Sequence, residues 1–240
     1  MKKFICSAII SSMFLLNSCL SEFIGSGPMS SQPRTVSSFT AINVESAFEV
    51  YLTQGDTDQL TIEAHNDVLP YIKSDVNGGV LHIYVDRSVW NSMRHPNNDL
   101  KAYITLRSLS GLEASGACDV RGSGTFPAEN LDINLSGASK IDLTVDVTGN
   151  INCDASGASD ITLKGTANTF KTMTLSGAST VSAFGLATQS ITMDLSGASD
   201  VEVSTNEMSI TASGASKIKY TGSPVIIYQD LSGASEIKHQ

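Results

Sequence analysis

From residue 113 onward, apolar and polar residues alternate along the chain, and the alternation restarts about every 20 residues. Each restart contains a short phrase of small residues, first as Ala114–Cys118 ("ASGAC") and last as Leu231–Ser235 ("LSGAS"). The first serine of the phrase stands at Ser115, Ser136, Ser156, Ser176, Ser196, Ser213 and Ser232. A two-residue alternation predicts strands, and a repeat of this length predicts a solenoid with one coil per repeat.

Each repeat places the same kind of residue at the same distance from its phrase. The position before the first serine is always Leu or Ala, and the fifth position after it is always Ile or Val. These columns predict a dry interior, with successive coils stacked as parallel strands about 4.8 Å apart. Glycine allows backbone angles that are closed to other residues, so the small phrase predicts a tight corner. We therefore expect an all-β protein, a parallel β-helix (β-solenoid) with about 20 residues per coil.

A second column predicts how the coils align. Four residues after each first serine, most of the residues are charged, and no two like charges are neighbours in chain order. Like charges that face each other on adjacent strands are destabilising, so this order supports stacking in register. The column consists of Asp119, Lys140, Asp160, Thr180, Asp200, Lys217 and Glu236.

Residues 35–112 predict a less regular β part. A polar stretch, Val89–Asp99, interrupts it and contains the single tryptophan, Trp90. For the Trp90–Asp99 loop two interpretations stay open: a cap over the open end of the solenoid, which we favour because exposed strand edges need cover, or a contact loop. The predicted strands are Ile42–Val44, Phe48–Leu52, Leu60–Ala64, Ile72–Val76, Val80–Val85 and Ala102–Leu106.

The N-terminus has the pattern of an export signal. Two lysines precede an apolar run, Phe4–Leu16, which is too short to span a bilayer as a stable helix. The following "LNSC", Leu16–Cys19, resembles a bacterial lipobox and implies cleavage before Cys19 and lipidation of Cys19; an ordinary signal peptide is the alternative. The predicted organisation is a lipoprotein signal peptide (1–18), a flexible tether (19–34) and one β-helix domain (35–240), whose residues 113–240 are the seven coils.

Composition and charge narrow the function. The net charge of −9 argues against nucleic acid, which needs a basic surface. Cys118 and Cys153 fall in different repeats at different offsets, so we expect two buried free thiols, and no cysteine or histidine cluster predicts a metal or another cofactor. Residues 122–240 contain no arginine, no tryptophan and one histidine, His239. Catalysis on polysaccharide needs clustered acids or acid–base pairs, so an enzyme is not expected.

The stretch from Phe39 to Val85, with "AFEVYLTQGD" inside it and followed by the repeated "SGAS", resembles the putative auto-transporter adhesin, head GIN domain family. The resemblance implies a β-helical protein of the bacterial cell envelope and brings no catalytic residues. We therefore expect a non-catalytic, lipid-anchored envelope protein at the outer membrane, acting as an adhesin or binding module for a protein or glycan. The alternatives are a self-associating scaffold (a homo-oligomer) and, less favoured, a polysaccharide-active enzyme.

Overall fold

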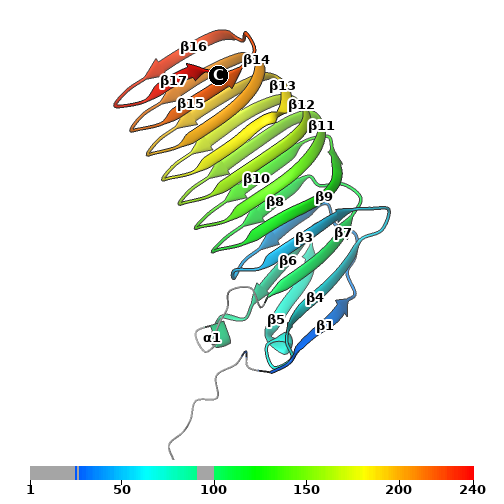
Figure 1. Ribbon diagram of the computed structural model, residues 1–240. Coiled ribbons are helices and arrows are strands. Elements are labelled where there is room, and N and C mark those ends of the chain that lie inside the picture. The colour runs from blue at the N-terminus through cyan, green and yellow to red at the C-terminus, as the bar shows by residue number, and fades with distance from the viewer. Residues whose placement is uncertain (1–24, 26, 91–99) are drawn as a thin grey trace, which may run out of the picture.

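The computed structural model describes residue 25, residues 27–90 and residues 100–240. These residues form a single 17-stranded sheet that is wound into an elongated solenoid (Figure 1). In the repeat region the strands stack in parallel at the spacing of the repeat, so the predicted all-β solenoid is confirmed. The predicted signal peptide, Cys19 and the stretch 91–99 of the predicted loop lie outside the described residues.

Each full coil is one long strand that leaves the corner, bends at the far side and returns to the next corner. Its outward half stacks on the outward half of the next coil, and its returning half on the returning half. Shorter strands form the same two halves where the coil is interrupted. The long strands are β11 (Lys140–Ala155), β12 (Asp160–Leu175), β13 (Thr180–Leu195) and β14 (Asp200–Ala212). The shorter ones are β8 (Gly111–Ala114), β9 (Asp119–Ala128), β10 (Leu131–Leu135), β15 (Lys217–Thr221), β16 (Val225–Leu231) and β17 (Glu236–His239).

The charged column stacks in the predicted register. Lys140 lies opposite Asp119 on one side and Asp160 on the other, and Lys217 lies opposite Asp200 and Glu236. Thr180 separates Asp160 from Asp200. In the described part of the chain, neither lysine forms an ion pair with these neighbours, so the column avoids repulsion rather than building salt bridges.

The interior is filled by the predicted apolar columns. The Leu or Ala before each corner and the Ile or Val after it are buried from the first coil to Ile218, near the C-terminal end. Three phenylalanines, Phe48, Phe126 and Phe170, are the largest side chains that are fully buried. Burial of alternate side chains along most of the strands makes one continuous core, which holds the coils together.

All six strands predicted in the N-terminal part are present. The order in which they stack differs from their order in the sequence. Strand β2 (Ala41–Val44) lies between β6 (Val80–Val85) and β8, and β3 (Glu49–Gln54) lies between β7 (Lys101–Leu106) and β9. The coil made by β6 and β7 is therefore stacked outside the coil made by β2 and β3, although it comes later in the chain. Antiparallel strands flank this outer coil: β4 (Gln59–His65) beside β7 and β5 (Ile72–Asn77) beside β6, with a 3-10 turn, Leu69–Tyr71, before β5.

The predicted tether is wrong for its last six residues. Met29–Arg34 form strand β1, which pairs antiparallel with β4 along its whole length. Its side chains are mostly exposed, so the polar Ser and Gln composition that predicted a tether suits an edge strand equally well. Among the described residues, no helix has the length and apolar character needed to cross a membrane.

Candidate functional site

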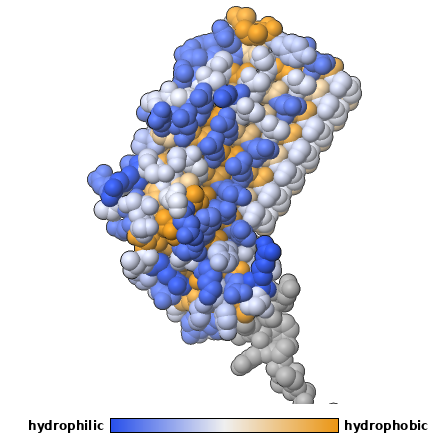
Figure 2. All heavy atoms as spheres, turned by 180° about the vertical axis from the view of Figure 1, so that it is seen from behind, coloured by the Kyte–Doolittle hydropathy of each residue, from blue (hydrophilic) through white to orange (hydrophobic). Residues whose placement is uncertain are grey.

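The corners of the repeat coils are structural. Their second serines, Ser139, Ser159, Ser179, Ser199 and Ser216, are buried, and each hydroxyl donates a hydrogen bond of 3.1–3.3 Å to the carbonyl of the serine three residues earlier. These hydroxyls close the turn and are not free as nucleophiles. Stacked on one another, the corners form a pale edge of small residues along the solenoid (Figure 2).

The corner glycines leave no room for a side chain. Gly177 has a φ of +85°, and a Cβ there would lie 2.4 Å from the carbonyl oxygen of Gly157 in the coil below. The same close approach recurs from Gly137 to Gly233. Real Cβ atoms do not come this close to a backbone oxygen, so the repeated glycine is required by packing as well as by backbone angle.

The two thiols are buried and free, as predicted. Cys118 takes the place of a corner serine, and its Sγ donates to the Ser115 carbonyl oxygen at 3.3 Å. Burial raises the pKa of the Cys118 thiol and raises that of Cys153 to about 12. Both thiols stay protonated at neutral pH, which removes them as nucleophiles or metal ligands.

The corners of the two N-terminal coils differ from the repeat. In the coil of β2 and β3 the corner reads Glu45–Phe48, with Phe48 in the place of the buried serine. Ser46 and Ala47 both have positive φ, 74° and 59°, which costs energy for residues other than glycine. In the outer coil, the connection from β6 to β7 spans residues 86–100, whereas the corner of a repeat coil has four residues. Helix α1 (Arg87–Trp90) lies near the start of this connection.

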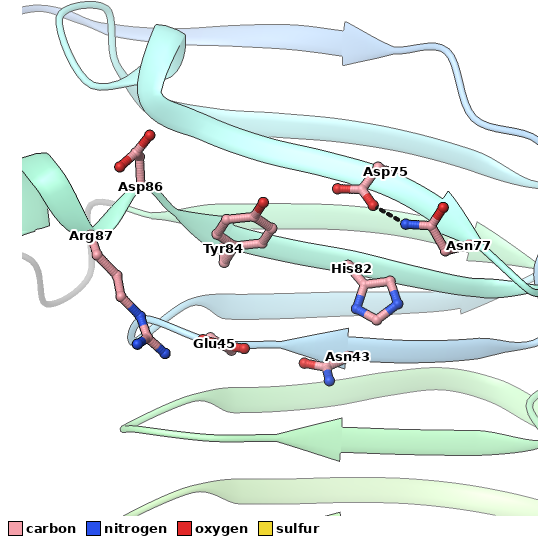
Figure 3. A pocket seen from close by; sticks show the side chains of 8 residues that line it. All are labelled: Asn43, Glu45, Asp75, Asn77, His82, Tyr84, Asp86 and Arg87. Atoms are coloured by element: carbon pink, nitrogen blue, oxygen red, sulfur yellow. Dashed lines mark hydrogen bonds between the residues drawn. The ribbon is translucent and has the colours of Figure 1, made fainter.

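A hollow of about 470 Å³ lies beside these two corners, on the outer face of β2, β5 and β6. Figure 3 shows how three neighbouring strands supply it: Asn43 and Glu45 from β2 and its end, His82 and Tyr84 from β6, and Asp75 and Asn77 from β5. Asp86 and Arg87, at the start of the long corner, close one side. The lining is polar apart from the Tyr84 ring.

Several of the lining groups are held in place by neighbours. The Asn77 amide donates to Asp75, and the Asn43 amide donates to Glu113 at 2.8 Å. The backbone N–H and the hydroxyl of Ser88 both donate to Asp86, which lowers the pKa of that carboxyl. The hollow therefore presents amides and carboxylates, several of them held by hydrogen bonds, beside the guanidinium of Arg87.

A second hollow, of about 360 Å³, adjoins the first and shares Glu45 and Arg87 with it. Its lining includes Trp90 and Ser46, one of the two residues with strained backbone. We call the two hollows together the N-terminal groove. It contains two aromatic side chains, Tyr84 in the first hollow and Trp90 in the second, together with charged groups such as Glu45 and Arg87 that line both. Strained backbone is often kept where it serves a binding site.

The sequence did not point to this groove. Its residues come from four segments. Trp90 stands at the start of the predicted loop, and Ser115 and Gly116 stand in the first corner phrase, but nothing in the sequence connects them with the other lining residues. Among the described residues, no group of three or more His, Cys, Asp or Glu side chains is arranged to hold a metal ion. Another aromatic pair, Tyr51 and Tyr103, lies on the opposite sheet, but the two rings stack on each other 5.1 Å apart and so cover one face of each.

The fold and the corner stack define the class of protein as a parallel β-solenoid with a glycine at each repeat corner. The chain matches the family described as putative auto-transporter adhesin, head GIN domain, over residues 38–224, and it belongs to that family. A comparison with curated proteins finds no match.

Solved structures share the fold. A putative adhesin from Bacteroides fragilis has 24% sequence identity and a TM-score of 0.80, over 90% of this chain and 99% of that chain. A putative adhesin from Parabacteroides merdae has 16% identity and a TM-score of 0.66, over 90% and 98% of the two chains. A putative lipid binding protein from Parabacteroides distasonis has 16% identity and a TM-score of 0.63, over the same shares.

Proposed function

We propose that this chain is a non-catalytic, lipid-anchored adhesin of the bacterial cell envelope that binds a glycan in its N-terminal groove. The observation that carries the proposal is the make-up of the groove: two aromatic side chains lie among amides and carboxylates, most of them on strands, and beside the guanidinium of Arg87 from helix α1. Family membership supports the class of protein, and the lipobox-like "LNSC" before and at Cys19 supports the anchor at the outer membrane.

The chemistry of the groove suits a sugar better than a lipid or an anion. Sugar hydroxyls both donate and accept, and Asn43, Asn77 and Arg87 donate where Asp75 and Glu45 accept. Aromatic rings such as Tyr84 pack against the apolar C–H faces of sugar rings. Carboxylates outnumber the single arginine, which opposes an anionic ligand. The side chains that line the first hollow are polar, charged or aromatic, whereas an acyl chain is best covered by aliphatic side chains.

Binding to a glycan array, followed by titration of the best glycan, tests the groove. We expect Tyr84→Ala to weaken binding about tenfold or more, because one buried aromatic contact is lost. Tyr103→Ala is the matched control, since Tyr103 is similarly exposed but lies on the opposite sheet. Equal binding by both variants, or no glycan bound by the unaltered chain, would overturn the glycan proposal.

Labelling of growing cells with a fatty-acid probe tests the anchor. The unaltered chain should take up the label and Cys19→Ala should not. If both chains are labelled equally, or neither is, the anchor proposal is wrong. The result is independent of glycan binding because the label reports on the N-terminus alone.

A further inference from the structure

The C-terminal end of the solenoid exposes apolar side chains that elsewhere in the molecule would be covered. We call β16, β17 and the corner between them the tip. In β16, Val225, Ile226, Ile227 and Tyr228 are 61%, 41%, 62% and 55% exposed, and the space-filling view shows an apolar patch at this end (Figure 2). They account for half of the large hydrophobic residues that are exposed in the described part of the chain.

The first four residues of strand β16, Val225–Tyr228, are apolar on both faces, unlike the strand beneath them, while Gln229 and Asp230 further along are polar. In β14, Glu207 and Ser209 point outward and alternate with buried Met208 and Ile210. In the register of the sheet, Val225 stands opposite Glu207 and Tyr228 opposite Ser209. At these two outward positions the side chain thus changes from polar to apolar at the last coil. A strand that is apolar on both faces is typical of one that is covered on both faces.

The backbone at the tip is also unpaired on one side. In the described chain, β16 pairs only with β14, and β17 only with β15. Each tip strand therefore keeps one edge of N–H and C=O groups without strand partners. An exposed apolar edge of this kind is a template for pairing with another strand.

The opposite end of the solenoid is built differently. Its edge strand β1 is antiparallel to the sheet and carries mostly polar exposed side chains, with Met29 as the apolar exception. Pro33 in β1 has no N–H to donate, and proline at an edge discourages further pairing. The other edge strand at this end, β5, pairs only with β6 among the described strands, but its exposed side chains, Lys73, Asp75 and Asn77, are polar or charged and oppose pairing with a second molecule. Tip-to-tip contact is therefore favoured over head-to-tail stacking into a filament.

We propose that the tip is a homophilic contact, in which the end coil of one molecule packs against the end coil of a second copy around a two-fold axis. A second copy offers an end coil of the same outline and the same unpaired edges. The charges agree with this arrangement: β17 carries Glu236 and Lys238 on one face, joined within the chain at 2.9 Å. A two-fold axis reverses strand direction, so Glu236 of each copy can lie beside Lys238 of the other.

Together with the proposed lipid anchor, this contact has a geometric consequence. The predicted anchor precedes β1 at one end of the solenoid, and the tip is the other end (Figure 1). Two molecules joined tip to tip carry their anchors at opposite ends of the pair. Such a pair connects two membranes rather than lying within one, which would make the chain a homophilic cell-to-cell adhesin.

Cysteine cross-linking of the full chain in its membrane tests the contact. Ile227→Cys places an exposed thiol on the tip, while Cys118 and Cys153 are buried and give little background. Under mild oxidation we expect a disulfide-linked product of twice the chain mass. Gln32→Cys, exposed on β1 at the other end, is the matched control and should give none. Absence of the product with Ile227→Cys, or a cross-link to a different protein, would overturn the proposal.

A charge exchange tests the two-fold arrangement by sedimentation of the detergent-solubilised full chain. Glu236→Lys should weaken the dimer about tenfold, because both copies then carry lysine at positions 236 and 238 and like charges face each other across the two-fold axis. Adding Lys238→Glu restores opposite charges and should restore the dimer. Ile227→Asp should also weaken it at least tenfold, with unchanged thermal unfolding because this side chain is exposed. A dimer that withstands all three variants would overturn the proposal.

Clustering of vesicles separates the tip from the anchor. Vesicles carrying the lipidated chain should aggregate, and vesicles carrying Ile227→Asp should not. A purified chain that cross-links at the tip but does not attach to vesicles would contradict the anchor and leave the tip contact standing. A chain that attaches but neither clusters vesicles nor cross-links would contradict the tip contact and leave the anchor standing.

Discussion

The corners of the repeat coils and the corners of the two N-terminal coils hold the same place in the solenoid but are built differently. In the repeat, glycine, a buried serine hydroxyl and close backbone contact make each corner a copy of the one beneath it. In the N-terminal coils, Ser46 and Ala47 take up strained angles, and the outer corner grows to residues 86–100. The groove lies beside these irregular corners and not along the regular stack. The regular corners leave no room for a side chain, and the irregular corners open a groove on the surface.

The largest effect should come from filling a corner. Gly177 and Gly222 have nearly the same positive φ, 85° and 83°, but a Cβ at Gly222 would meet nothing within 4 Å. Gly177→Ala should therefore lower the free energy of unfolding by more than about 3 kcal/mol, and Gly222→Ala by about 1 kcal/mol. Thermal and denaturant unfolding give both values. Equal losses would mean that the corners are open enough to admit a methyl group.

The next effect concerns the buried hydroxyl. Ser179→Ala leaves the Ser176 carbonyl without its 3.3 Å hydrogen bond and should cost about 1.5 kcal/mol. Ser235, the equivalent residue at the tip, has a buried hydroxyl with no partner among the described atoms. Ser235→Ala should therefore change stability by less than about 0.5 kcal/mol in the same unfolding assay. A larger loss at Ser235 than at Ser179 would contradict this account of the corner.

A smaller effect is expected in the charged column. Lys140→Glu places three carboxylates in a row on β9, β11 and β12, which should cost about 1 kcal/mol at low salt and less at high salt. Lys171→Glu makes the same charge change outside the column and is the control. In double-mutant cycles Lys140 should couple to Asp160 but not to Asp200, two coils away. Equal coupling of Lys140 to Asp160 and to Asp200 would mean that the loss of stability comes from the net charge of the protein and not from the stacking register.

The smallest predicted effect is a gain in stability rather than a loss. Ala47→Gly removes the cost of a positive φ and should stabilise the chain by about 0.5 kcal/mol. Ala138→Gly, at a repeat corner without positive φ, should destabilise it by about 0.5–1 kcal/mol. If Ala47→Gly is destabilising instead, the N-terminal corner is not strained, and the contrast between the two kinds of corner is lost.

The repeat was predictable because each coil faces the same constraints. The column of Ile and Val predicts buried positions, the glycine predicts the corner, and the order of Asp119, Lys140 and Asp160 predicts the stacking register. All three predictions agree with the structure. The N-terminal strands were also predictable, one by one, from their alternation. The order in which these strands stack was not predictable. The alternation within a strand shows which of its side chains are buried, but not which other strands lie beside it.

The groove was hidden for a related reason. Asn43, Asp75 and His82 become neighbours only through the pairing of β2, β5 and β6, and each one alone is an ordinary exposed polar residue on a strand. The corner at Ser46 carries no glycine, so its left-handed angles left no mark in the sequence. Strand β1 was missed because an edge strand without buried side chains has no alternation to detect.

The far bend of the coil, opposite the corner, is where the repeat changes length. Between β13 and β14 the register shifts from Ala183 to Ala187, and three residues of β13 have no counterpart, yet the corners on either side stack normally. A gene that encodes such a protein can gain or lose residues at the bend, or duplicate a whole repeat in frame, without disturbing its neighbours. Each duplicated repeat moves the tip further from the N-terminal end of the solenoid by the thickness of one coil. The length of the molecule can therefore evolve in steps of one repeat.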